Sequence, residues 1–269
     1  MKAYAFAAAA GVALFWAAPS FSAAVTAGEV PLDAPVVVMG EEHDVPAHHA
    51  NQADWVRRLA PRAVVFEMLP PDLAEVAMAR RDAAPAELGA ALSWEARGWP
   101  DFAAYHPIFD ALGEALILGA EVPRGDLARA AEEGAAAVRP DAGVFALDRA
   151  LAPEEQAARE AEQAAAHCDL LPDAALPGIV EAQRLRDAAL AAAVLEGLDR
   201  TGGPVAVITG NGHARRDRGV PALLSVARPD LEVIALGQFT ESREVAPFDA
   251  WVVTEVPPDR LADPCAALR

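Results

Sequence analysis

The chain has 269 residues and a formal net charge of −18 at neutral pH. Proteins that bind nucleic acid or dock on anionic lipid need the opposite sign of charge, so we expect neither kind of partner. The length is sufficient for one well-buried domain, to which we assign residues 23–269.

Residues 1–22 have the pattern of a signal peptide, with Lys2 followed by an uncharged run over residues 3–18. This run is shorter than the roughly 20 apolar residues of a membrane-spanning helix. Small residues stand just before Ala23, where we expect cleavage. No cysteine lies near that point for lipid attachment, so we expect an exported protein of the bacterial periplasm, with no stable membrane anchor after cleavage.

The two cysteines are Cys168 and Cys265. An exported protein meets an oxidising compartment, in which the two can form a disulfide. The sequence does not show whether they are close in space. Neither belongs to a Cys-x-x-Cys pair, so thiol redox chemistry and zinc-finger folds have no support.

Alternating strand and helix patterns predict an α/β fold, with a mainly parallel sheet of about five strands flanked by helices. The apolar, β-branched run at 35–39 is typical of a buried strand. A helix is expected at 46–60, with Asp44 able to cap it and Pro46 in its first turn. A second strand at 63–66 completes a βαβ unit, whose strands pair in parallel.

Residues 69–115 carry no strand signal and are rich in alanine, proline and aromatic residues. We expect a small inserted helical subdomain there, placed as a lid over the strand ends. Helices are expected again over about 126–200, most clearly at 179–199, where apolar residues share one face. The remaining expected elements are strands at 116–122, 205–208, 231–236 and 250–255 and a helix at 219–227.

Acidic and imidazole side chains stand at the ends of four predicted strands. These ends face the same side of a parallel sheet, where ligands of open α/β sheets bind. Strand-to-helix turns favour polar residues in any case, but ionisable groups at separate strand ends favour a shared site. The residues are Glu41, Glu42 and His43 after the first strand, Glu67 after the second, Glu121 near the end of the third and His213 after the fourth.

Two kinds of chemistry suit Glu41, His43, Glu67 and His213. Together they can bind a divalent metal ion that activates water. Alternatively, a glutamate or histidine can act as general base without a metal. The turn around Asn211 would expose backbone amides that could hold an anion. Spacing alone does not choose among a metal site, a metal-free general base and an anion site.

Further candidate ligands lie outside the strand ends. His48 and His49 open the first helix, where capping or packing suits them as well as ligation. Tyr105 and His106 lie in an aromatic segment at 98–109. A tyrosine phenolate is a good ligand for ferric haem, and a neighbouring base would help to ionise it. The alternative is that these aromatic side chains merely pack the insertion on the core.

Several short motifs occur in order along the chain. Residues 40–49 read Gly-Glu-Glu-His-Asp-Val-Pro-Ala-His-His, and Phe-Glu-Met follows at 66–68. Further motifs are Gly-Trp-Pro and Tyr-His-Pro between residues 98 and 107, Ala-Gln-Arg-Leu-Arg-Asp at 182–187, and Gly-Asn-Gly-His at 210–213. Together, from about residue 35 to 240, they resemble the ChaN-like haem-binding uptake proteins, which belong with the Tiki, TraB and erythromycin-esterase-like proteins.

The resemblance implies an envelope protein of haem or iron uptake that holds haem through a tyrosine, with a homodimer as one arrangement. Tyr105 is the only tyrosine after the predicted cleavage point. His106, His48, His49 and Asn211 are the further cofactor-binding candidates. The rival expectation is a hydrolase in the manner of the Tiki or erythromycin-esterase relatives, in which Glu41, His43, Glu67 and His213 bind a metal ion or activate water.

Overall fold

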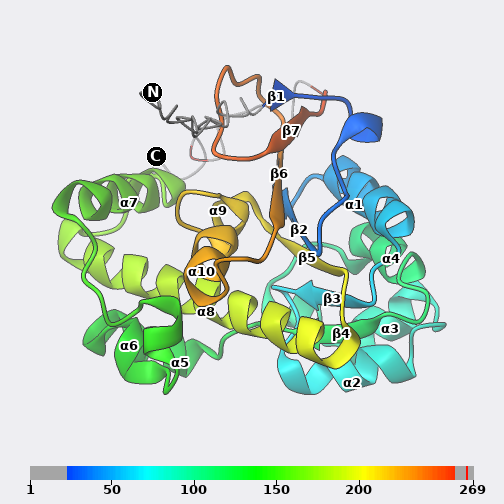
Figure 1. Cartoon of the computed structure of the whole chain (residues 1–269), viewed down its shortest axis with the longest axis horizontal. Coiled ribbons are helices and arrows are strands. Elements are labelled where there is room, and N and C mark those ends of the chain that lie inside the picture. Colours follow the sequence, from blue (N-terminus) through cyan, green and yellow to red (C-terminus); the bar gives the residue numbers. More distant parts are fainter. Residues whose placement is uncertain (1–22, 258–264, 266–269) are drawn as a thin grey trace, which may run out of the picture.

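The computed structural model describes residues 23–257 and residue 265, so the expected signal peptide lies outside the described residues. Within these residues, seven strands form one sheet, with helices on both faces (Figure 1). The strands lie in the order β1-β7-β6-β2-β5-β3-β4, and every described pair is parallel. The α/β class is confirmed, whereas the expected number of about five strands is too low.

The strands match the apolar runs of the sequence except at the sheet edge. β1 is only two residues long and therefore carries no alternating pattern that sequence reasoning could detect. The strands are β1 (Ala23–Ala24), β2 (Val36–Glu41), β3 (Ala63–Phe66), β4 (Leu116–Gly119), β5 (Val205–Gly210), β6 (Val233–Phe239) and β7 (Ala250–Val253).

The central strand β2 is buried along its whole length and pairs with β5 on one side and β6 on the other. The register places Glu41 opposite Gly210, and Phe66 of β3 opposite Ile208. Glu67 continues this ladder, because its backbone amide donates to the Ile208 carbonyl at 3.1 Å. The pairing therefore brings the carboxyl ends of β2, β3 and β5 to one level.

One face of the sheet is covered by α1 and by the helices of the expected insertion, on the right of Figure 1. The insertion is helical, and Trp94, Phe102, Tyr105 and Phe109 are buried with the sheet in one hydrophobic cluster. This segment is therefore continuous with the core. The elements are α1 (Pro46–Leu59), α2 (Pro71–Ala79), α3 (Pro85–Ala91), the 3₁₀ turn η2 (Glu95–Arg97) and α4 (Phe102–Asp110).

The N-cap position of α1 is Val45, one residue after Asp44, and the Val45 side chain does not cap the helix. Pro46 at the first helical position has no N–H to satisfy. The His48 amide donates to the Val45 carbonyl at 2.9 Å, so this amide needs no side-chain acceptor.

The other face is covered by the helices between β4 and β5 together with α10. The longest, α8, crosses beneath the sheet, and its Gly197 lets it approach closely, because an added Cβ would lie 3.3 Å from Ala63 and Leu118. Around β4 and β5 the described elements are α5 (Arg124–Glu133), α6 (Ala135–Val138), η3 (Ala142–Phe145), α7 (Pro153–Ala166), η4 (Asp173–Ala175), α8 (Leu176–Thr201), α9 (Asn211–Ala214) and α10 (Val220–Ala227). A further short turn, η1 (Ala27–Glu29), follows β1.

Cys168 and Cys265 form a disulfide across 97 residues of sequence. It ties residue 265 to the connection between α7 and α8. Within the described residues, no helix is both long and apolar enough to cross a membrane.

Gly119 offers a direct test of how tightly β4 is packed. A Cβ there would lie 2.4 Å from the Leu69 carbonyl oxygen and 2.5 Å from that of Pro70, so backbone would have to move. We expect Gly119→Ala to lower the free energy of unfolding by about 1–3 kcal/mol in urea denaturation. Gly125→Ala, where nothing lies within 4 Å, is the control and should not lower it. Equal stability of the two variants would contradict this packing.

Candidate functional site

Two neighbouring cavities lie where the strands end. The first has a volume of about 320 Å³ and the second about 390 Å³. Both are lined by His43, Gln183 and His213, so they form two parts of one cleft, which we call the strand-end cleft. A hollow of about 740 Å³ lies beside β4, but of the predicted site residues only Glu121 reaches it. The strand-end cleft is therefore the candidate site, as expected for the carboxyl edge of a parallel sheet.

Glu41 is buried at the end of β2 and accepts two close contacts. The Tyr105 hydroxyl donates to its Oε1 at 2.5 Å, and Nδ1 of His43 lies 2.7 Å from the same oxygen. Burial alone would raise the pKa of Glu41, but hydrogen bonds and charge from His43 and His49 hold the pKa at about 2. Glu41 is therefore a buried carboxylate anion.

His43 is held between Glu41 and the cleft. Burial opposes its positive charge, but the hydrogen bond to Glu41 and the charges of Glu67, Glu41 and Asp44 raise its pKa to about 9. Its side chain is 34% exposed and lines both cavities. A Cβ on Gly210 would lie only 2.8 Å from Nε2, which places that nitrogen at the strand ends. With Nδ1 bound to Glu41, Nε2 is the ring nitrogen left to meet a ligand.

Glu67 and Asp187 flank His213. Glu67 accepts hydrogen bonds from the Thr209 hydroxyl at 2.6 Å and the Gly210 amide at 2.8 Å. His213 places Nδ1 2.7 Å from Asp187 Oδ1 and Nε2 3.5 Å from Glu67 Oε1. Burial lowers the pKa of His213, but the two carboxylates outweigh it and raise the pKa above its usual value.

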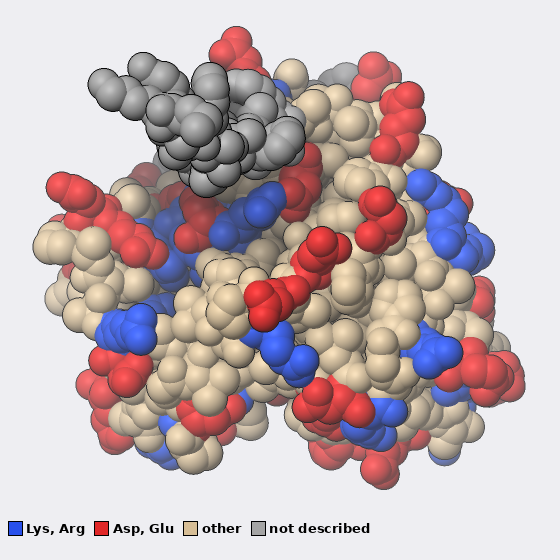
Figure 2. Space-filling model, in the orientation of Figure 1, with Lys and Arg blue, Asp and Glu red and all other residues tan. Residues whose placement is uncertain are grey.

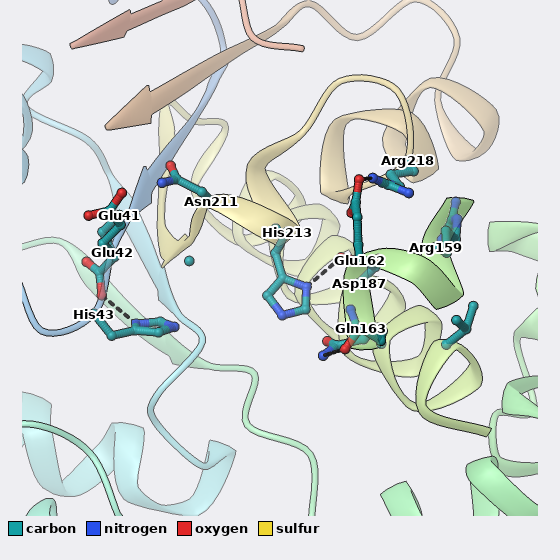
Figure 3. A pocket seen from close by; sticks show the side chains of 14 residues that line it. Glu41, Glu42, His43, Arg159, Glu162, Gln163, Asp187, Asn211, His213 and Arg218 are labelled. Atoms are coloured by element: carbon teal, nitrogen blue, oxygen red, sulfur yellow. Dashed lines mark hydrogen bonds and ion pairs between the residues drawn. The ribbon is translucent and has the colours of Figure 1, made fainter. Parts of the chain in front are cut away.

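The two imidazoles face a common space. In Figure 3 the rings of His43 and His213 project into the first cavity from opposite sides. His43 comes from the loop after β2 and His213 from α9 after β5, so the paired strand ends bring them together. Of the predicted site residues, Glu41, His43, Glu67 and His213 thus do meet in one place.

Tyr105 is placed behind this group. It is fully buried, stacks on His49 with ring centroids 3.8 Å apart, and lines neither cavity of the strand-end cleft. Burial, followed by the negative charge of Glu41, raises its pKa well above the usual value of a tyrosine. Tyr105 could reach a ligand in the cleft only by giving up Glu41 and leaving its buried position.

The remaining predicted residues have other surroundings. His48 is buried and accepts a hydrogen bond from the Glu42 amide at 3.1 Å, and burial lowers its pKa to about 4, so it is neutral. His106 contacts Asp110 at 3.2 Å and lies outside both cavities. Asn211 bonds to the backbone of Gln238 and lines the first cavity.

Two of the strand-end acids reach the cleft in different parts. Glu42 lines the first cavity and accepts from the Thr240 hydroxyl at 2.9 Å. Glu121 lines the second cavity and pairs with Arg97. Both are therefore cleft residues, as their position in the sequence predicts.

Sequence reasoning missed the contribution of α7 and α8. Gln183, Arg186 and Asp187 enter the cleft from α8, and Arg159 and Glu162 from α7. The motif at 182–187 has a spacing that places Gln183, Arg186 and Asp187 on one helical face. Figure 2 shows basic side chains gathered in the recess beside α7, while acidic ones are spread over the outer surface.

Within the described part of the chain, no group of three or more His, Cys, Asp or Glu side chains is arranged to hold a metal ion. The described residues thus contain no preformed set of ligands for the divalent ion considered from the sequence.

A family model described as haem-binding uptake, Tiki superfamily, ChaN matches residues 31–224. A search of curated proteins finds no match. Among solved structures, ChaN of Campylobacter jejuni with cofacial haem is similar over 81% of this chain and 86% of that chain, with 19% sequence identity and a TM-score of 0.64. At this identity the likeness shows the fold.

Two other solved structures match with TM-scores below 0.5. The type III effector HopBA1 has a TM-score of 0.42 at 13% identity, covering 84% of this chain and 90% of that chain. A succinoglycan biosynthesis protein has a TM-score of 0.45 at 14% identity, covering 77% of this chain and 67% of that chain.

The Glu41–His43 pair predicts a stability optimum. The pKa of Glu41 is lowered from 4.5 to about 2, so its contribution is complete above pH 4.5 and is lost as the pH falls toward 2. The pKa of His43 is raised from 6.5 to about 9, so its contribution is complete below pH 6.5 and is lost as the pH rises toward 9. Thermal denaturation from pH 3 to 10 should show this, with His43→Gln flattening the alkaline side. An unchanged alkaline slope in that variant would contradict the pairing.

Proposed function

This chain belongs to the haem-binding uptake family of the Tiki superfamily typified by ChaN, and we propose that it binds haem in the strand-end cleft. The observation that carries the proposal is the orientation of the His43 ring. Its Nδ1 is bound to a buried carboxylate while its Nε2 meets the cleft. Histidines that ligate metals usually have their second ring nitrogen held by such a partner, which fixes the tautomer and the ring orientation.

The second cavity suits the rest of a haem. It is lined by the apolar side chains Leu127 and Leu190, by Trp99 and by three arginines. Each cavity lies within the roughly 300–1,000 Å³ typical of cofactor and ligand sites, and the two share His43, Gln183 and His213 as lining residues. A flat apolar ring with two carboxylates needs this mixture of apolar surface and cations.

Bound haem would supply an iron centre, and the residues of the chain would orient it. We assign the iron-facing role to His43. Because its pKa is about 9, Nε2 would have to give up its proton on binding the iron, while Glu41 would keep the Nδ1 proton and the Tyr105 hydroxyl would donate to Glu41. The sequence pointed to Tyr105 as the iron ligand. Its burial and raised pKa argue instead for a supporting role behind His43.

The place of the protein in the cell is part of this proposal. We propose export to the bacterial periplasm and a role in haem or iron uptake, supported by the pattern of residues 1–22 and by the Cys168–Cys265 disulfide, which suits an oxidising compartment. A homodimer that holds haem between subunits is the arrangement to be tested by sedimentation of the haem-loaded protein.

A hemin titration followed by absorption spectroscopy tests the proposal. Wild-type protein should give a saturable spectrum, and His43→Ala should lower the affinity about 10- to 100-fold or more, because loss even of a ligand's supporting partner has that effect. Tyr105→Phe should retain a spectrum of the same ligand type. A ferric tyrosinate spectrum that disappears in Tyr105→Phe and persists in His43→Ala would assign the ligand to Tyr105, and no saturable spectrum in wild type would reject haem binding.

A second function, hydrolysis, is favoured by the Asp187–His213 pair. Nδ1 of His213 is held by a buried carboxylate at 2.7 Å while the ring faces the first cavity, which is the arrangement of an oriented general base. Burial raises the pKa of Asp187, and its contact with Nδ1 would hold the imidazole in one tautomer and orientation.

A panel of ester and amide substrates, assayed without haem, tests this second function. We expect any turnover to fall at least 100-fold in His213→Ala, the usual contribution of a general base. Asp187→Asn should reduce it in the same direction, since the orientation of the imidazole would be lost. Turnover that is insensitive to both changes would exclude this role.

A further inference from the structure

Arg186 lies at the wall of the second cavity. It lies on α8, between the buried residues Leu185 and Asp187, and is itself partly buried. Burial lowers its pKa, and the charges of Glu67 and Asp187 only partly offset this. Among the ion pairs of the described residues, none includes Arg186, although several arginines around the cleft are paired: Arg97 with Glu121, Arg159 with Glu155 and Arg218 with Glu162.

A partly buried cation without an ion pair costs stability, because it gives up hydration without gaining a partner. Such a cation does little to stabilise the fold. A negatively charged ligand is therefore a candidate partner for it.

Arg124 approaches the same cavity from another element. It begins α5, is exposed, and likewise takes part in none of the ion pairs of the described residues. α5 packs against α8, so the two guanidinium groups are held by neighbouring helices at one cavity. Leu127 and Leu190 line the same cavity and offer apolar surface.

We propose that Arg186 and Arg124 bind the carboxylates of a large apolar dicarboxylate, which for haem are the two propionates. This inference rests on the proposed haem function and adds to it the residues that select for acidic side arms. A guanidinium matches a carboxylate with two parallel hydrogen bonds, which gives geometric selection as well as charge. The molecule as a whole carries a net charge of −18, so an anionic ligand needs local cations of this kind.

The test compares hemin with hemin dimethyl ester, in which both propionates are capped and uncharged. Wild-type protein should bind hemin about 10- to 100-fold more tightly than the diester, the range for one or two charge-assisted hydrogen bonds. Arg186→Gln should lower the affinity for hemin by a similar factor and leave the affinity for the diester nearly unchanged. Arg124→Gln should have the same selectivity with a smaller effect, because Arg124 is exposed. Arg80→Gln, an exposed arginine on the other helical layer, is the control and should change neither affinity.

Ligand-free stability separates this role from a structural one. Removing a cation that has no ion pair should leave the melting temperature of Arg186→Gln unchanged or raised, while its affinity for hemin falls. Equal losses for hemin and the diester, or a lowered melting temperature together with unchanged selectivity, would overturn the inference while leaving haem binding intact. Wild-type protein that binds neither compound would overturn the proposed function together with this inference.

Discussion

The buried charge of Glu41 governs the roles of the groups around it. A carboxylate at the end of the central strand stays ionised there because hydrogen bonds and charge from His43 and His49 outweigh the effect of burial, and the Tyr105 hydroxyl donates to one of its oxygens. The same charge raises the pKa of His43 and opposes ionisation of Tyr105. The charge of Glu41 thus assigns two different roles: His43 presents a ring nitrogen to the cleft, and Tyr105 stays a neutral hydrogen-bond donor behind it.

Charge is also distributed unevenly over the molecule. The surface is acidic, yet the cleft is bordered by arginines, most of them tied to carboxylates on the same or a neighbouring element. Paired cations of this kind add little net field, since each is neutralised locally. Against that background Arg186 and Arg124 are distinctive, because the positive charge they bring to the second cavity is available to a ligand.

Much of the architecture could be predicted, since β-branched runs such as the one in β2 mark buried strands and parallel pairing then brings their ends together. The meeting of Glu41, His43, Glu67 and His213 follows from that rule. The burial of Tyr105 could not be predicted, because an aromatic cluster has the same sequence pattern whether it lines a cavity or packs in a core. Asp187 and Arg186 were likewise out of reach as site residues: helical periodicity shows that they share a face, but not that α8 turns this face toward the strand ends. The partnership of Cys168 with Cys265 depends on distances that no local pattern records.

The long helix α8 joins distant parts of the molecule mechanically. Gln183, Arg186 and Asp187 lie near its first third, and Gly197 lies near its other end, pressed against Ala63 and Leu118 of the sheet. Because a helix of this kind behaves as a stiff rod, its fit at Gly197 sets how far its other end stands from His213. The width of the cleft is thereby determined in part by the absence of a methyl group about three turns away, and related chains could retune their ligand preference by substitution there, without altering any residue that a ligand touches.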